Sequence, residues 1–168
     1  LAFTTALVAL SLATPSFAAN FTITNGQTVG AQTIGAGETG TVDTGGTIST
    51  TGNAENAITS TGTGGTVINN GTLNTTGVNS VAVFSSGNSA NITNNSVIHT
   101  TNQGGYGLHA TGNTSTLTNT GNINIDDAFT HAMQLDGTDS TATNTGTITT
   151  LDTQGFGLYS NGANNTLT

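Results

Sequence analysis

Apolar residues recur along most of the chain at a fixed spacing of 25 residues, with no insertion between repeats. The repeats begin at Thr44, Asn69, Asn94, Asn119 and Asn144. The apolar positions form three columns: Ile48, Leu73, Ile98, Ile123 and Ile148; Ile58, Val83, Leu108, Met133 and Leu158; and Val67, Ile92, Leu117, Ala142 and Leu167. A period of this length is typical of solenoid proteins, in which each repeat completes the core of its neighbours.

Each apolar residue lies in a short segment that alternates polar and apolar positions, such as Thr47-Ile48-Ser49 or Thr116-Leu117-Thr118. Alternation of period two predicts β-strands. The many β-branched residues and glycines, without a 3.6-residue period, exclude helical repeats. We therefore predict an all-β fold, a right-handed parallel β-helix of about six coils with three short strands each. Each strand pairs in parallel with its equivalent in the next coil, about 4.8 Å away.

Two further columns are expected to support the backbone. Glycine recurs at Gly62, Gly87, Gly112, Gly137 and Gly162. This column suits a turn that needs positive φ. Asparagine begins four successive repeats from Asn69 onward, and its amides can stack coil upon coil. Residues 19–43 are interpreted as a degenerate capping coil, with Ile23, Gly37 and Val42 in the same 25-residue register. The five regular repeats then occupy residues 44–168.

The first eighteen residues have the pattern of a secretory signal peptide. An apolar run, LAFTTALVALSL, is too short to cross a membrane, and small residues Ser16 and Ala18 flank Phe17 as in a cleavage site. No Met and no basic residue precede the run, so we expect this signal peptide to be truncated at its N-terminus. The pattern predicts an exported protein.

The composition excludes several partners. The chain has no Lys, no Arg and no Cys, and its eight acidic residues give a net charge of −8. Binding to nucleic acid or to anionic lipid needs cationic side chains, so neither is expected. Without disulfides, stability must come from backbone ladders and the core. We expect no cofactor and no metal site.

The repeats resemble autotransporter passenger domains, which are secreted by the type V route. Two features carry the resemblance: repeats that begin with the motif N-x-G-[TN]-[IL], and pairs of a small and an apolar residue. These pairs are Ala57-Ile58, Ala82-Val83, Gly107-Leu108, Ala132-Met133 and Gly157-Leu158. The resemblance implies a β-helical, adhesin-like passenger at the bacterial outer membrane, on the cell surface or secreted. It also implies a C-terminal outer-membrane β-barrel, whose amphipathic strands do not occur in these residues; either the barrel lies beyond Thr168 or the resemblance does not extend to the secretion route.

Aromatic residues occupy two columns near the third strand of each repeat. Phe84, His109 and Tyr159 share a column that alternation places outward, and they are candidate ligand-surface residues for adhesion or glycan stacking. Ordinary exposed side chains are the alternative interpretation. Tyr106, His131 and Phe156 share another column and are expected to form a packing stack.

Other polar groups carry weaker signals. His99, His109 and His131 lie in three different columns, so we expect the fold to scatter them rather than to form a metal triad. Asp136, Gly137 and Asp139 are interpreted as an acidic turn.

Asp127 and Asp152 share a register one coil apart. They are a possible carboxylate pair, suited to a retaining glycosidase or to Ca²⁺. Two solvated loop acids are the alternative interpretation.

Three functions follow from these patterns. The first is a non-catalytic surface passenger, an adhesin or rigid stalk that contacts host-cell or bacterial surface receptors or glycans and can self-associate. The second is a polysaccharide-degrading enzyme built on Asp127 and Asp152, because β-helices also carry such enzymes. The third is an ice-binding solenoid that uses outward threonine rows, which Asn91 and Ile68 interrupt. Threonine also favours strands for ordinary reasons.

Overall fold

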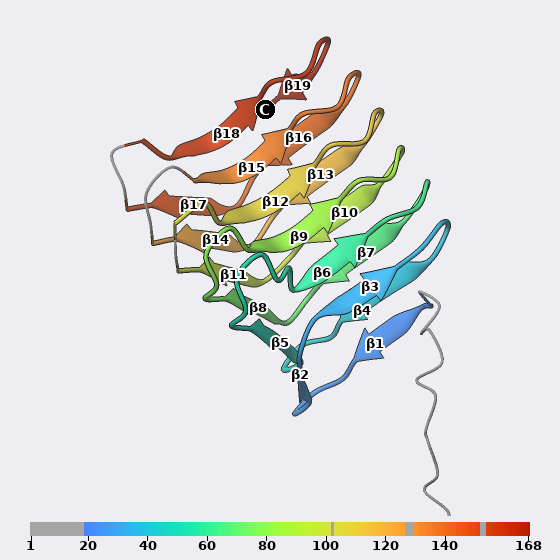
Figure 1. Cartoon of the computed structure of the whole chain (residues 1–168), viewed down its shortest axis with the longest axis vertical. Helices are drawn as coiled ribbons and strands as arrows, with labels where there is room; N and C mark the ends of the chain where they lie inside the picture. Colours follow the sequence, from blue (N-terminus) through green and yellow to red (C-terminus); the bar gives the residue numbers. More distant parts are fainter. Residues whose placement is uncertain (1–18, 102, 127–129, 152–153) are drawn as a thin grey trace, which may run out of the picture.

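The computed structural model describes residues 19–168 except 102, 127–129 and 152–153. The predicted signal peptide at 1–18 therefore lies outside the described residues. Every regular element in the described part is a β-strand, and the strands stack coil upon coil into a parallel β-solenoid (Figure 1). The predicted fold class is confirmed. Within the same residues, no helix has the length and apolar character needed to cross a lipid bilayer.

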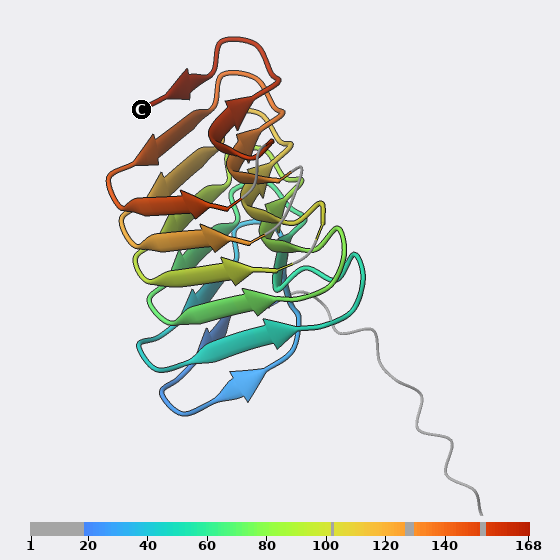
Figure 2. The ribbon, with the colours of Figure 1, turned by 90° about the vertical axis from the view of Figure 1, so that its left-hand side faces the viewer.

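The strands form three parallel sheets, called A, B and C here, and each coil contributes one strand to each sheet (Figure 2). Sheet A contains β1 (Phe21–Ile23), β4 (Thr39–Val42), β7 (Thr66–Asn69), β10 (Asn91–Asn94), β13 (Thr116–Asn119), β16 (Thr141–Asn144) and β19 (Thr166–Leu167). Sheet B contains β2 (Thr28–Val29), β5 (Thr47–Thr50), β8 (Thr72–Thr75), β11 (Val97–Thr100), β14 (Asn122–Ile125) and β17 (Thr147–Thr150). Sheet C contains β3 (Gln32–Ile34), β6 (Ile58–Ser60), β9 (Val81–Ser85), β12 (Tyr106–Ala110), β15 (His131–Leu135) and β18 (Phe156–Ser160).

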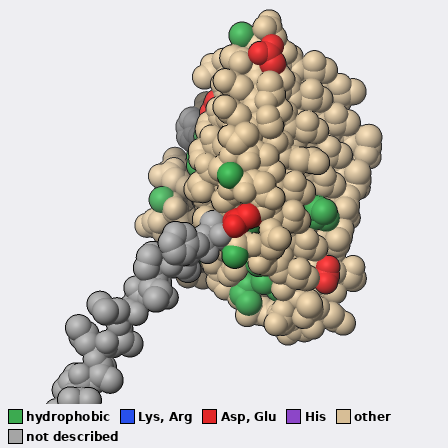
Figure 3. All heavy atoms as spheres, turned by 90° about the vertical axis from the view of Figure 1, so that its right-hand side faces the viewer, with side chains coloured by type: hydrophobic (Ala, Val, Ile, Leu, Met, Phe, Trp, Pro, Cys, Tyr) green, Lys and Arg blue, Asp and Glu red, His purple; other side chains and the backbone are tan. Residues whose placement is uncertain are grey.

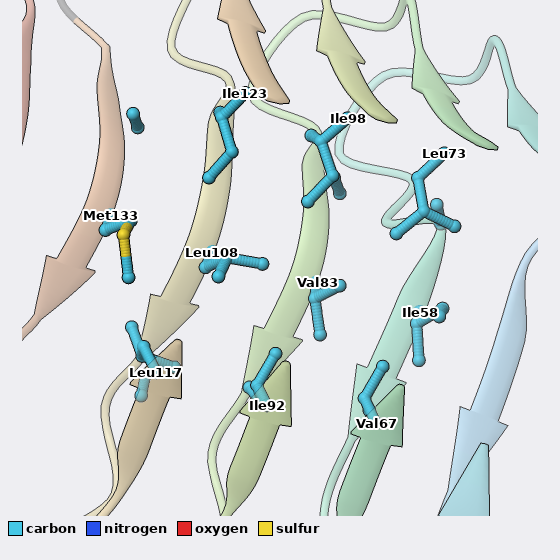
Figure 4. Packing of buried hydrophobic residues seen from close by; sticks show 14 of the residues in the cluster. Ile58, Val67, Leu73, Val83, Ile92, Ile98, Leu108, Leu117, Ile123 and Met133 are labelled. Atoms are coloured by element: carbon cyan, nitrogen blue, oxygen red, sulfur yellow. The ribbon is translucent and has the colours of Figure 1, made fainter. Parts of the chain in front are cut away.

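The three predicted apolar columns are the three walls of the core. The pairing of Ile98 with Ile123, of Leu108 with Met133 and of Ile92 with Leu117 follows the 25-residue period. Their side chains point into one continuous interior (Figure 4), and all six are fully buried. Burial of each aliphatic side chain stabilises the fold by roughly 1.5–3 kcal/mol. In the last coil the burial weakens, and Leu167 is 40% exposed.

A ladder of asparagine amides runs up the inner edge of sheet A, as predicted. The Nδ2 atoms of Asn69, Asn94 and Asn119 each donate to the Oδ1 atom of the asparagine one coil later, at 2.7 Å. The final acceptor is Asn144. An amide carries both a donor and an acceptor, so identical side chains satisfy one another when they stack. Three of these four residues are almost fully buried, which makes the ladder obligatory once the coils stack.

The glycine column is confirmed, but the reason given for it is wrong. Positive φ occurs two residues later, at Gly64, Ser89, Thr114, Asp139 and Asn164. A Cβ atom added at Gly87, Gly112, Gly137 or Gly162 would instead overlap the carbonyl oxygen of the glycine one coil earlier. The column therefore marks the place where successive coils approach most closely, and a left-handed backbone plays no part there.

The register expected for the capping coil is also wrong. Ile23 pairs with Val42, and Val42 pairs with Asn69, so neither follows the 25-residue period. In the second coil, residues 51–57 form a turn between β5 and β6. The first coil lacks this turn, because Gln32 directly follows the segment equivalent to β5 and itself pairs with Ile58. Because of the shorter turn, the residues of β1 and β2 pair with residues 19 positions later rather than 25.

We predict that Asn94→Ala lowers the free energy of unfolding by about 2–4 kcal/mol, because two buried amides then lose a partner. Urea-induced unfolding measures the change. Asn95→Ala is the matched control, because the Asn95 amide bonds to Asn70 in an exposed row. The control should stay within about 0.5 kcal/mol of the wild type. Equal effects of the two variants would contradict a structural role for the ladder.

Threonine hydroxyls inside sheet B differ in whether they find a partner. Thr50 Oγ1 donates to the Glu55 carbonyl at 3.2 Å, whereas Thr100 Oγ1 is buried without a hydrogen-bond partner. The residue that pairs with Thr100 one coil later is Ile125, which shows that an aliphatic side chain fits this column. An unpaired buried hydroxyl costs free energy that an apolar side chain of similar shape does not.

We therefore predict that Thr100→Val raises the free energy of unfolding by about 1 kcal/mol, because it removes that unpaired hydroxyl. Thr50→Val, which deletes a hydrogen bond that is made, should not stabilise the protein. The measurement compares the midpoints of urea-induced unfolding of the two variants with that of the wild type. Destabilisation by Thr100→Val would show that its hydroxyl has a partner in solution.

Candidate functional site

The strands of sheet C place two columns of rings on the same outer side. Residues three apart in a regular strand point to opposite faces. In β12, however, Gly107 and Leu108 are both buried, so Tyr106 and His109 on either side of them are both accessible from outside. Val81 pairs with Tyr106 and Phe84 with His109, so the two columns continue one coil earlier, where Phe84 is half-buried and Val81 is buried. The small-apolar pair in each repeat therefore brings both aromatic columns to one face.

Six rings form a continuous chain of contacts along this face. We call Phe84, Tyr106, His109, His131, Phe156 and Tyr159 the aromatic patch. The His109 ring centroid lies 5.4 Å from that of Phe84 and 5.0 Å from that of Tyr106. His131 continues the chain, 5.8 Å from Tyr106, and stacks on Tyr159 at 4.4 Å. These separations are typical of favourable aromatic pairs.

The structure therefore confirms that Phe84, His109 and Tyr159 lie on the outer side, where sequence alternation placed them. Their role as ligand-surface residues stays a prediction. The stack of Tyr106, His131 and Phe156 is also confirmed, but it is part of the outer patch rather than a separate packing feature. The expected scattering of the histidines is wrong for His109 and His131, which share the patch, while His99 lies in sheet B.

A partly buried polar network fixes the middle of the patch. His109 Nε2 lies 2.8 Å from Asp136 Oδ2, and Gln134 Nε2 donates to both oxygens of the same carboxylate at 2.8 and 3.0 Å. Gln134 is only 8% exposed, and its Oε1 atom has no partner. The carboxylate therefore holds the His109 ring and the Gln134 amide in fixed orientations.

Sequence reasoning missed this role of Asp136, which was interpreted as part of a turn. A usable signal exists in the spacing. Asp136 lies 27 residues after His109, which is one coil plus two positions, and His99 contacts Asp126 at the same offset. An acid at this offset directly follows the strand of the next coil in the same sheet, and its side chain contacts the histidine one coil earlier.

Burial shifts the pKa values of two residues in the patch, Tyr106 and His131. Burial raises the pKa of the Tyr106 hydroxyl, and the negative charges of Asp136 and ionised Tyr159 raise it further. Tyr106 is therefore a hydrogen-bond donor at neutral pH. Burial lowers the pKa of His131, against smaller opposing effects of the Thr130 backbone and Asp136. His131 Nδ1 accepts a hydrogen bond from the Phe156 backbone N–H at 3.2 Å, as a neutral imidazole can.

A shallow hollow of about 330 Å³ opens at the N-terminal end of the patch. The aromatic residues that line it are Phe84, Tyr106 and His109. Asn56 and Asn79, from the turns that join sheet B to sheet C, line it as well. The hollow thus combines ring faces with amide groups, which is the usual make-up of a small-molecule site.

The threonine rows form on the outside of sheet A. One row pairs Thr116 with Thr141 and Thr141 with Thr166, and its earlier part passes through Asn91. The parallel row is interrupted at Ile68, which pairs with Thr41 and Thr93. The rows and their interruptions are therefore as the sequence predicts. Ice binding by these rows stays a prediction.

Asp127 and Asp152, the possible carboxylate pair, lie outside the described residues. Among the residues that the structure does describe, no three His, Cys, Asp or Glu side chains are grouped so as to hold a metal ion. On the face shown in Figure 3, acidic and hydrophobic side chains lie in small spots among backbone and other side chains.

Comparisons with protein-family models, with curated proteins and with solved structures find no match for this chain.

We predict that acidification destabilises the protein through His131. The unfolded chain binds a proton at this residue near pH 6.5, whereas the folded protein binds it only at lower pH. Stability from the neutral ring is therefore fully present above the unfolded pKa and is lost as the pH falls below it. Urea unfolding between about pH 7 and pH 5 should show a falling free energy of unfolding, and His131→Phe should reduce that slope. An unchanged slope in the variant would contradict this assignment.

Proposed function

We propose that the protein is an exported, non-catalytic surface protein, a rigid stalk that attaches to cell surfaces through its aromatic patch. The patch is the observation that supports this proposal. It gathers both tyrosines of a chain that is only 5% Phe, Trp and Tyr. Phe156, at its C-terminal end, is 55% exposed. Exposed, clustered aromatic side chains are typical anchors of binding surfaces.

The solenoid suits such a role mechanically. Its core and its three parallel sheets run through the described coils, and the amide ladder joins the coils from Asn69 to Asn144, so the patch lies on a stiff frame. A preformed surface loses less conformational entropy on binding than a flexible one. Solenoids characteristically offer extended binding surfaces of this kind.

The route of export is a further part of the proposal. The signal-peptide pattern and the resemblance of the repeats to autotransporter passengers support placement on the bacterial outer membrane, on the cell surface or in the medium. The proposed partners are host-cell or bacterial surface receptors or glycans, and other copies of the protein. With no Lys or Arg in the chain, anionic partners are disfavoured.

Neither alternative function has comparable support. A polysaccharide-degrading enzyme would depend on Asp127 and Asp152, and no described contact bears on them. Ice binding would depend on threonine rows that Asn91 and Ile68 interrupt, and strand propensity alone accounts for their threonines.

The test is adhesion of beads coated with the chain to immobilised cells, extracellular matrix and glycans. We predict that the double variant Phe156→Ala/Tyr159→Ala reduces adhesion roughly tenfold or more, because two neighbouring anchors are lost. Thr141→Ala/Thr143→Ala on sheet A is the matched control and should adhere like the wild type. Adhesion that survives loss of the two rings, or no adhesion to any of these surfaces, would overturn the proposed role of the patch.

A further inference from the structure

We propose that the hollow at the N-terminal end of the aromatic patch binds one neutral pyranose ring of a glycan. The inference deepens the proposed attachment function and rests on it. It assigns a ligand class to a site formed by Phe84, Tyr106, His109, Asn56 and Asn79.

The size of the hollow favours a single sugar ring. Its volume of about 330 Å³ lies at the lower end of the range for small-molecule sites, roughly 300–1,000 Å³. It is shallow and open, so one face of a ring can enter while the rest of a glycan chain stays in solvent. A site of this shape suits a terminal or branching sugar.

The ring faces supply the apolar half of the recognition. Phe84 and His109 meet edge to face at 5.4 Å, and Tyr106 is tilted against His109 at 5.0 Å. A pyranose presents C–H groups on one face, with a weak positive polarisation that suits the negative face of an aromatic ring. Asp136 holds His109 by a 2.8 Å contact, so its ring is already oriented before a ligand arrives.

The amides supply the polar half. Asn56 uses its Oδ1 atom to accept from the Val81 N–H at 3.0 Å, and its Nδ2 atom makes one long contact of 3.4 Å with Thr59. An amide nitrogen has two hydrogens, so Asn56 retains a donor for a sugar hydroxyl. Asn79 is exposed in the turn one coil later. Hydroxyl groups that both donate and accept are the natural partners of such amides.

The electrostatics favour a neutral sugar over a charged ligand. Apart from the titratable groups of His109 and Tyr106, the described residues that line the hollow are uncharged. A sialic or uronic acid would find no Lys or Arg, because the chain has none. A cationic ligand would need a free carboxylate, but Asp136 already accepts from His109 and Gln134.

The experiment is ligand-observed and protein-observed NMR on the full chain with soluble probes. The neutral probes are methyl β-D-glucopyranoside, methyl β-D-galactopyranoside and methyl α-D-mannopyranoside. The charged probes are N-acetylneuraminic acid, glucuronic acid and choline. We expect at least one neutral probe to bind with a roughly millimolar dissociation constant, as a single ring should. The charged probes should bind at least roughly tenfold more weakly.

Variants locate the site. Tyr106→Ala should weaken binding of the neutral probe roughly tenfold or more, and Tyr106→Phe, which keeps the ring, should stay within about threefold. Asn79→Ala is a second variant for the case that Tyr106→Ala does not fold. It should fold, because Ala54 adopts the same positive φ at the equivalent position one coil earlier. It should also weaken binding. Thr141→Ala/Thr143→Ala lies on sheet A, outside both the hollow and the aromatic patch, and should leave binding of the neutral probe unchanged.

Two outcomes would overturn the inference and leave the proposed function standing. One is adhesion that depends on the patch while no neutral probe binds or competes. The other is a charged probe that binds more tightly than every neutral one. Binding of a neutral probe that survives both Tyr106→Ala and Asn79→Ala would place it elsewhere and would also overturn the inference. If a neutral probe binds as expected while adhesion is absent, only the proposed function fails.

Discussion

In-register parallel stacking is the constraint on which the rest of the structure depends. It makes the residue one coil earlier the nearest neighbour of each side chain. Every column must therefore consist of residues whose side chains can pack closely against the equivalent side chains of adjacent coils. Aliphatic residues do so in the core, and amides satisfy one another in the ladder through Asn94. Repeated charges would repel at this spacing. Asp139, accordingly, stacks on the neutral amide of Asn164 rather than on another acid.

This constraint also explains which features sequence alone could predict. A period of 25 residues identifies vertical neighbours without any knowledge of the turns, so the core columns and the asparagine ladder followed from counting. The same counting failed at the first coil, where the turn equivalent to residues 51–57 is missing and Val42 pairs with Asn69. It also gave the wrong reason for Gly112. A column of glycines can reflect positive φ or close backbone approach, and the repeat does not distinguish between them.

The candidate site was predicted in part for a similar reason. Alternation from Leu108 placed His109 outward, but strict alternation would also place Tyr106 on the opposite face. The buried pair Gly107-Leu108 breaks that rule, and only the folded strand shows that the two rings come together. Asp136 lies one coil plus two residues after His109, so a comparison of positions exactly one period apart does not reveal their contact.

Stacking favours like residues, so the places where a column changes identity at each coil carry information about function. In the outer columns of sheet A threonine predominates and pairs with threonine at three successive coils, with interruptions at Asn91 and Ile68. The outer column of sheet C instead changes from Thr59 to Phe84, His109, Gln134 and Tyr159. Neither the core nor the ladder requires those rings. Their gathering on one face of an otherwise repetitive surface supports the proposal that sheet C, rather than the threonine rows, is the attachment surface.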